Sequence, residues 1–311
     1  MLKKGLLLAA ALIVAILILA PCALPGTLPV SVIPDGASWI AHVDMEKFVA
    51  TRLYEYLEKD GRLQIKSRDI TRMLKIDLFK DITGLTVFGF GPGHKRAVFA
   101  AAGKFDKNRL LTLLDLDEDH REIPYGGSTI YSMDDDEFGA FVNENLIVFG
   151  ERQGDVEKVL DTAAGKMKNF GSSKLHEAFK NNSAGAFISG VVENLSGLDR
   201  EIGRSRLVGK ASGVFFSARE NQDALEVRAR VSADTPESAK DMADIAQGFI
   251  AMIRLGQGHE GHEGGGDRAA SLLQGLQIKL EGNTVGLEIN VPSSEYPNLM
   301  SRGRHFSRFL D

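Results

Sequence analysis

The chain has 311 residues, of which 43% are hydrophobic and 25% are charged, as is typical of a globular protein long enough for two domains. Its net charge of −5 and its pI of about 5.9 argue against a nucleic acid as a general partner. The single cysteine, Cys22, excludes a disulfide within the chain, so packed cores and sheets have to supply the stability.

Residues 1–24 have the pattern of a signal peptide or an N-terminal membrane anchor. Lys3 and Lys4 precede an apolar run over residues 5–20, and Pro21 ends that run. A positive start, an apolar segment and then small or helix-breaking residues are typical of export, and this run is just long enough to cross a bilayer. Because positive residues stay in the cytoplasm, we expect the rest of the chain to be extracytoplasmic, with the membrane as the partner of the N-terminal segment.

Three fates of this segment stay open. A retained anchor would hold the protein at the inner membrane, facing the periplasm. Cleavage, with Ala20 and Cys22 at the −3 and −1 positions, would release a secreted protein. Lipidation of Cys22 is the third, because residues 19–22 resemble a lipobox, although Pro21 stands where that motif has Gly, Ala or Ser.

Residues 25–36 contain three prolines and two glycines, which predicts an extended linker. A first α+β domain is expected over 37–168. Alternating apolar residues predict strands, and Asp106 is in the position of a helix N-cap. The expected strands are 38–44, 84–90, 96–105, 120–125, 128–133, 137–143 and 146–150, and the expected helices are 45–59, 67–80, 107–114 and 153–164.

A second α+β domain is expected over 169–300, followed by a basic tail at 301–311. Thr235 and Pro236 are typical of an N-cap and a first helical residue, and an apolar stripe continues the helix to about 255. The alternation over 225–231 indicates a sheet with one face in water. The expected strands are 185–191, 211–219, 224–233, 276–281 and 284–291, and the expected helices are 173–180, 194–203, 235–255 and 268–275.

Both halves have the order strand, helix, hairpin, capped helix, hairpin, helix. The repeated order favours a duplication of one unit. The sequence therefore predicts an α+β fold with two tandem domains, each an antiparallel sheet with helices on one face.

A histidine-rich segment over 256–267 has the residue types of a metal site. His259, Glu260, His262 and Glu263 could ligate a divalent metal through imidazole and carboxylate groups. The zinc-protease pattern needs histidines four residues apart on a helix, whereas these are three apart in a glycine-rich segment. The alternatives are a metal site and a flexible loop that connects two helices, and the sequence favours the loop.

The other candidate motifs favour structural roles. Residues 89–96 are glycine-rich but lack the ending of a phosphate loop and lie between two strands, which predicts a hairpin turn. The acidic runs 134–137 and 115–119 lack calcium-loop spacing and predict solvated turns. His42 lies within an apolar strand and is expected to be a satisfied core or edge histidine. No Gly-x-Ser-x-Gly sequence occurs, and no second cysteine is available for redox work. We expect no cofactor and favour a protein that is not an enzyme.

Residues 34–39, Pro-Asp-Gly-Ala-Ser-Trp, lead into a strand that ends at Asp44. Together with the leader and the repeated unit, this layout resembles the bacterial extracytoplasmic families of the DUF3352 type, whose function is unknown. The resemblance covers residues 34–300 and transfers no functional residue.

We expect a non-enzymatic protein of the cell envelope that acts as a binding or scaffolding module, with another envelope protein as a possible partner. One alternative is an extracytoplasmic metal-dependent hydrolase that uses His259 and His262. A second alternative is a carrier of an apolar ligand held between sheet and helices.

Overall fold

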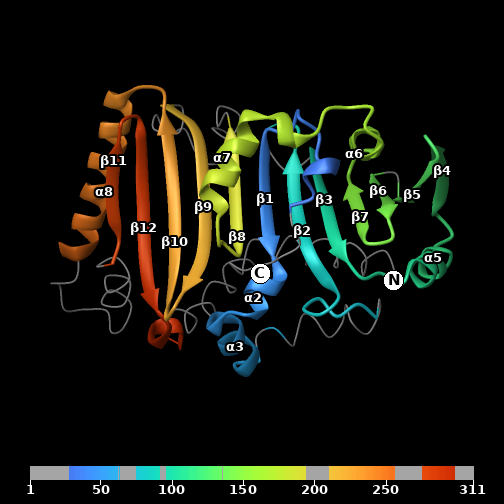
Figure 1. The fold of residues 1–311 in the computed structure, drawn as a ribbon, viewed down its shortest axis with the longest axis horizontal. Helices are drawn as coiled ribbons and strands as arrows, with labels where there is room; N and C mark the ends of the chain where they lie inside the picture. The colour runs from blue at the N-terminus through green and yellow to red at the C-terminus, as the bar shows by residue number, and fades with distance from the viewer. Residues whose placement is uncertain are drawn as a thin grey trace.

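A computed structural model describes residues 28–61, 63, 75–91, 96–134, 136–193, 210–255 and 275–297. They form an α+β fold built on one antiparallel sheet of twelve described strands (Figure 1). The strands are β1 Trp39–Asp44, β2 Ile82–Gly89, β3 Ala97–Gly103, β4 Arg121–Tyr125, β5 Ser128–Asp134, β6 Glu137–Asn143, β7 Leu146–Gly150, β8 Ile188–Glu193, β9 Ala211–Asn221, β10 Ala224–Ala233, β11 Gln277–Glu281 and β12 Thr284–Pro292. The described α-helices are α2 Met45–Val49, α3 Arg52–Lys59, α5 Lys107–Leu114, α6 Gln153–Ala163, α7 Lys174–Ser183 and α8 Pro236–Leu255, and short 3₁₀ turns are η1 Val30–Val32, η3 Phe170–Ser172 and η7 Ser293–Glu295.

The sheet has the strand order β11-β12-β10-β9-β8-β1-β2-β3-β7-β6-β5-β4. β1 and β8 lie side by side at its middle, where Ile40 pairs with Val191 and Val43 with Ile188 (Figure 1). Strands β2 to β7 lie on the β1 side of this pair, and strands β9 to β12 lie on the β8 side. The antiparallel α+β architecture is confirmed, but the two expected sheets are joined at β1 and β8 into one sheet.

The two faces of this sheet are covered by different helices. Face 1 carries Ile40 and Phe88, which pack with residues of η1, α6 and α7. Face 2 carries Val43 of β1, which packs with residues of α2 and α3, and Val285 of β12, which packs with α8. The prediction of helices on one face only was therefore wrong. Ile40 and Val43 point to opposite faces of the same strand, and both are buried, so each face needs a cover.

Two close approaches fix how aromatic rings lie on face 2. The indole of Trp39 lies over Gly89, where an added Cβ would be 2.5 Å from the ring, and its Nε1 donates to Gly91 O at 3.0 Å. The ring of Phe216 lies over Gly190 in the same way, at 2.3 Å from an added Cβ. Only glycine at these two strand positions leaves room for the rings.

The predicted helix starts are confirmed where side chains cap them. Asp106 Oδ1 accepts from the Arg109 N–H at 3.0 Å, and Thr235 Oγ1 accepts from the Ser238 N–H at 3.1 Å. The single helix expected over 45–59 was wrong, because Thr51 has an extended backbone and caps a second helix. Its Oγ1 accepts from the Tyr54 N–H at 3.0 Å, which separates α2 from α3.

Several predicted elements fall wholly or partly outside the described residues: the leader over 1–24, the helices over 194–203 and 268–275, and the tail over 301–311. Of the helix expected over 67–80, only 75–80 are described, and residues 78–81 form a turn. Within the described part of the chain, no helix combines the length and the apolar character that a bilayer crossing requires.

Candidate functional site

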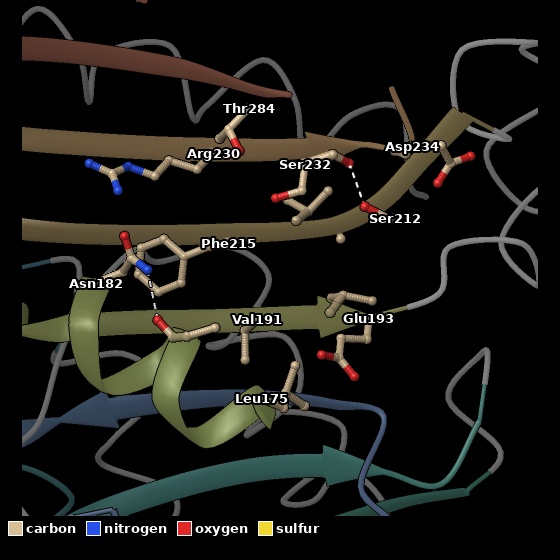
Figure 2. A pocket seen from close by; sticks show the side chains of 15 residues that line it. Leu175, Asn182, Val191, Glu193, Ser212, Phe215, Arg230, Ser232, Asp234 and Thr284 are labelled. Atoms are coloured by element: carbon tan, nitrogen blue, oxygen red, sulfur yellow. Dashed lines mark hydrogen bonds between the residues drawn. The ribbon is translucent and has the colours of Figure 1, made fainter. Parts of the chain in front are cut away.

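A groove of about 750 Å³ opens on face 1, between α7 and the strands β8, β9 and β10 (Figure 2). Its apolar lining comes from Leu175, Val191 and Phe215. Its polar lining comes from Asn182, Glu193, Ser212, Arg230, Ser232, Asp234 and Thr284. Arg230 lies toward one end of the groove, whereas Glu193 and Asp234 lie toward the other (Figure 2). The groove therefore joins an apolar floor to ends of opposite charge.

One wall of the groove is α7. Ser173 caps this helix by accepting from the His176 N–H at 3.0 Å. Leu175 and Phe179 are buried against the sheet on the inner side of the helix. Asn182 near its end donates from Nδ2 to Ala178 O at 2.7 Å, which directs the amide along the wall.

The floor of the groove is the end of an apolar row that crosses the sheet on face 1. The row consists of paired residues on neighbouring strands: Val98 on β3, Phe88 on β2, Ile40 on β1, Val191 on β8 and Phe215 on β9. All five are buried. The next residue in the row, on β10, is the exposed Arg230, so the apolar row stops at β10.

A second row on face 1, one step along the strands, is polar. Its members are Thr86 on β2, His42 on β1, Ser189 on β8, Ser217 on β9, Arg228 on β10 and Glu288 on β12. The first four are buried, and His42 Nδ1 lies 2.9 Å from Thr86 Oγ1. The prediction that His42 is a satisfied core histidine is confirmed.

Charged side chains continue across β9, β10, β12 and β11. Glu226 is 6% exposed and pairs with Arg219, at 2.9 Å, and with Arg228. Glu288 lies 3.6 Å from Arg228 Nε and 3.3 Å from Lys279 Nζ. Burial opposes the ionisation of Glu288, but the hydrogen bond from Lys279 and the charges of Arg228 and Lys279 outweigh it and lower its pKa. These five residues, three cations and two anions, pair with one another, and we call them the charged ladder.

Arg230 differs from the two arginines of the charged ladder. It is exposed, and it makes no ion pair with any residue that the structure describes. The side chains around it in the groove are neutral, and its neighbour across the sheet on β12 is Gly286. Its guanidinium is therefore a donor group available to a ligand.

A buried carboxyl, that of Asp44, lies at the end of β1, outside the groove lining. Asp44 is 5% exposed and caps α2 by accepting from the Lys47 N–H at 3.2 Å. Burial raises the pKa of the Asp44 carboxyl to about 7, although the hydrogen bond and the charge of Lys47 lower it in part. Lys47 also pairs with this carboxylate and donates to Ala186 O at 3.4 Å, so Asp44 and Lys47 tie α2 to the chain before β8.

The candidate metal ligands His259, Glu260, His262 and Glu263 lie outside the described residues, so the metal site stays a prediction. Among the residues that are described, no three His, Cys, Asp or Glu side chains come together as a metal site would require. The acidic run 134–137 joins β5 to β6, as a turn between strands should.

Sequence reasoning did not single out Arg230, Phe215 or the ends of the groove. A signal was present in β10, where alternation places Glu226, Arg228 and Arg230 on one face. Alternation shows that these side chains share a face. It does not show that Glu226 and Arg228 have partners on β9 and β12 whereas Arg230 has none.

No protein-family model matches the chain, and no curated protein matches it either. Among solved structures, the chain is similar to TP0453 in crystal form I, with 10% identity and a TM-score of 0.49 over 90% of this chain and 98% of that one. Crystal forms III and IV of TP0453 also have 10% identity and a TM-score of 0.49, over 89% of this chain.

Proposed function

We propose that the protein is a non-enzymatic binding module of the cell envelope and that the groove beside α7 is its binding surface. The observation that carries the proposal is the change in face 1 at β10. Up to β9, one row of the face is apolar and packs with α6 and α7, and the next row carries buried polar side chains. At β10 both rows become charged, and α8 packs on the opposite face there. The groove opens at this boundary, where a ligand meets both kinds of surface.

The lining of the groove offers a ligand both an apolar surface and hydrogen-bond donors. Phe215 supplies a flat apolar floor, and Arg230 supplies donors at a fixed place on a strand. Binding sites typically combine such an apolar surface with a few well-placed polar groups. Because these groups stand on a sheet and on a capped helix, the site is preorganised, which lowers the cost of ordering it on binding.

The leader supports the extracytoplasmic part of the proposal. Its positive start and apolar run are the pattern of a signal peptide or an anchor, and the membrane would be the partner of this segment. The layout resemblance to families of the DUF3352 type points to the same compartment.

We also propose that the two halves, 37–168 and 169–300, descend from one duplicated unit. Each half contributes a central strand, a hairpin beside it, a capped helix and an outer hairpin. The outward strand order is β1-β2-β3-β7-β6 in the first half and β8-β9-β10-β12-β11 in the second. The hairpin of β4 and β5 is additional in the first half.

Cysteine labelling and cross-linking in intact cells of the natural host test the proposed function. The full chain would carry Cys22→Ser together with Ser212→Cys in the groove or, as a matched control, Lys240→Cys on α8. We expect a membrane-impermeant maleimide to label both positions in intact cells, and a thiol cross-linker to give an adduct of defined size from position 212 only. Labelling that needs cell lysis would contradict the extracytoplasmic placement, and equal adducts from both positions would contradict the assignment of the groove.

A further inference from the structure

The groove has a cation at one end and two carboxylates at the other. Arg230 and Asp234 stand on or directly after β10, four residues apart. At about 3.3 Å per residue, their Cα atoms are about 13 Å apart along the strand. Glu193, at the end of β8, is exposed beside the acidic end. Because the Arg230 side chain extends away from Asp234 (Figure 2), a ligand that matches both ends carries an anion and a cation at least as far apart as those two Cα atoms.

The middle of the groove offers neutral groups to a ligand. Thr284 on β12 pairs with Ser232 on β10, and both hydroxyls face the groove lining between the charged ends. Asn182, on α7, lies toward the Arg230 end (Figure 2). Its Nδ2 donates to Ala178 O, and its Oδ1 makes no hydrogen bond with the described residues. Hydroxyl and amide groups opposite an apolar floor suit a ligand with alternating polar backbone and apolar side chains.

These features separate several chemical classes of ligand. A nucleic acid places one negative charge on every nucleotide, and Glu193 and Asp234 would repel it. A free small anion would use Arg230 and leave the acidic end unused. An extended peptide has the same rise per residue as β10, so an acidic and a basic side chain four positions apart would reach both ends.

We propose that the groove binds an extended peptide segment that has an acidic and a basic residue at positions i and i+4. The acidic side chain pairs with Arg230, and the basic side chain pairs with Asp234 and Glu193. The side chain at position i+2 shares their face and rests on Phe215, because side chains of an extended peptide alternate between two faces. This inference rests on the proposed function, since it names the ligand of the same groove.

A rhodamine-labelled peptide tests the inference by fluorescence polarisation with the full chain in dodecyl maltoside. The probe is Glu-Val-Thr-Val-Lys, blocked at its C-terminus, and the neutral control is Gln-Val-Thr-Val-Gln. We expect saturable binding of the probe that is about tenfold tighter than binding of the control, because charge-assisted hydrogen bonds discriminate by about that factor. Arg230→Ala should remove the part of this preference that comes from the acidic residue of the peptide, whereas Lys240→Ala on α8 should leave the preference unchanged.

Charge reversal gives the sharper result. With Arg230→Glu, Lys-Val-Thr-Val-Lys should bind better than Glu-Val-Thr-Val-Lys, in the opposite order to the native chain. Absence of saturable binding, or an affinity order that Arg230→Glu does not invert, would overturn the inference. An adduct at position 212 in cells together with either of these results would leave the proposed function in place and remove only the peptide ligand.

Discussion

The third strand outward from the middle of the sheet is β3 on one side and β10 on the other, and the two strands differ on face 1. β3 presents Val98 and Ala100 there, and both are buried under α6 and its neighbours. In the same rows, β10 presents Arg230 and Arg228. Both strands are antiparallel to both of their neighbours, so the type of pairing does not distinguish them, whereas the side chains on face 1 do.

The two regions also differ in what stabilises them. Buried valines such as Val98 and Val148 each contribute about 1.5–3 kcal/mol through removal of apolar surface from water. The exposed pairs of the charged ladder contribute about 0–1 kcal/mol each, because solvent screens them. Glu226 is the exception, since it is buried and depends on Arg219 and Arg228.

The largest expected effect comes from exchanging residue types within one row. Val148 on β7 pairs with Ala100, and Glu288 on β12 pairs with Arg228 in the same row. Val148→Glu should cost about 3–5 kcal/mol, because it buries a carboxylate without a partner, whereas Glu288→Val should change stability by less than about 1 kcal/mol. Urea unfolding measures the loss of stability in both variants. Similar losses would show that the two ends of this row do not differ in what they tolerate.

A smaller effect is expected inside the charged ladder. Glu226→Ala leaves Arg219 and Arg228 partly buried without their shared carboxylate, and should cost about 2–3 kcal/mol. Lys279→Ala removes an exposed partner at the rim and should cost less than about 0.5 kcal/mol. Thermal unfolding of the two variants would show this difference, and equal midpoints would mean that Glu226 is not the centre of the network.

Two carboxyls, that of Asp44 at the end of the central strand β1 and that of Glu288 in the charged ladder, predict opposite responses to pH. The Asp44 pKa is raised from 3.8 to about 7, so its stabilising contribution is complete below pH 3.8 and is lost as the pH rises to about 7. The Glu288 pKa is lowered, so its contribution is present above pH 4.5 and is lost as the pH falls.

Asp44→Asn keeps a capping side chain and removes the titration. It should therefore increase stability at pH 8 by an amount on the order of 2 kcal/mol and flatten the profile between pH 4 and pH 7. Denaturant midpoints over pH 4–8 test this, with Asp106→Asn, at an exposed helix cap, as the matched control. An unchanged slope in Asp44→Asn would contradict the raised pKa.

The smallest effect is expected for the free arginine. Arg230→Ala should change unfolding by less than about 0.5 kcal/mol, because it breaks no ion pair with a described residue. Arg228→Ala should cost about 1–2 kcal/mol, because it removes a partner of the buried Glu226. Calorimetry measures the stability of both variants. Equal losses of stability would show that Arg230 contributes to the fold as much as Arg228 does.

The sequence predicted the local features well because local residues determine them. Asp106 and Thr235 are side chains that cap the turn directly after them, and the alternation over 225–231 places Glu226, Arg228 and Arg230 on one face of β10 as expected. Of these three, only Arg230 is exposed to water, because partners on neighbouring strands cover the other two. Thr51 is the exception, because it lies within a run of helical spacing and its role as a cap appears only from its backbone geometry.

The pairing of β1 with β8 could not be predicted, since it joins residues about 150 positions apart by backbone bonds that most sequences can make. The groove was missed for the same reason. Phe215, Arg230 and Asn182 come from three elements, and only the register of β8, β9 and β10 brings them together.

The change of face 1 at β10 is tested most directly by thiol labelling of two positions in one row. In a chain with Cys22→Ser, Val98→Cys on β3 and Arg230→Cys on β10 each provide the single thiol. We expect Arg230→Cys to react in the native protein nearly as fast as a small thiol, whereas Val98→Cys should react only as fast as the protein opens. Equal native labelling rates at the two positions would contradict this expectation.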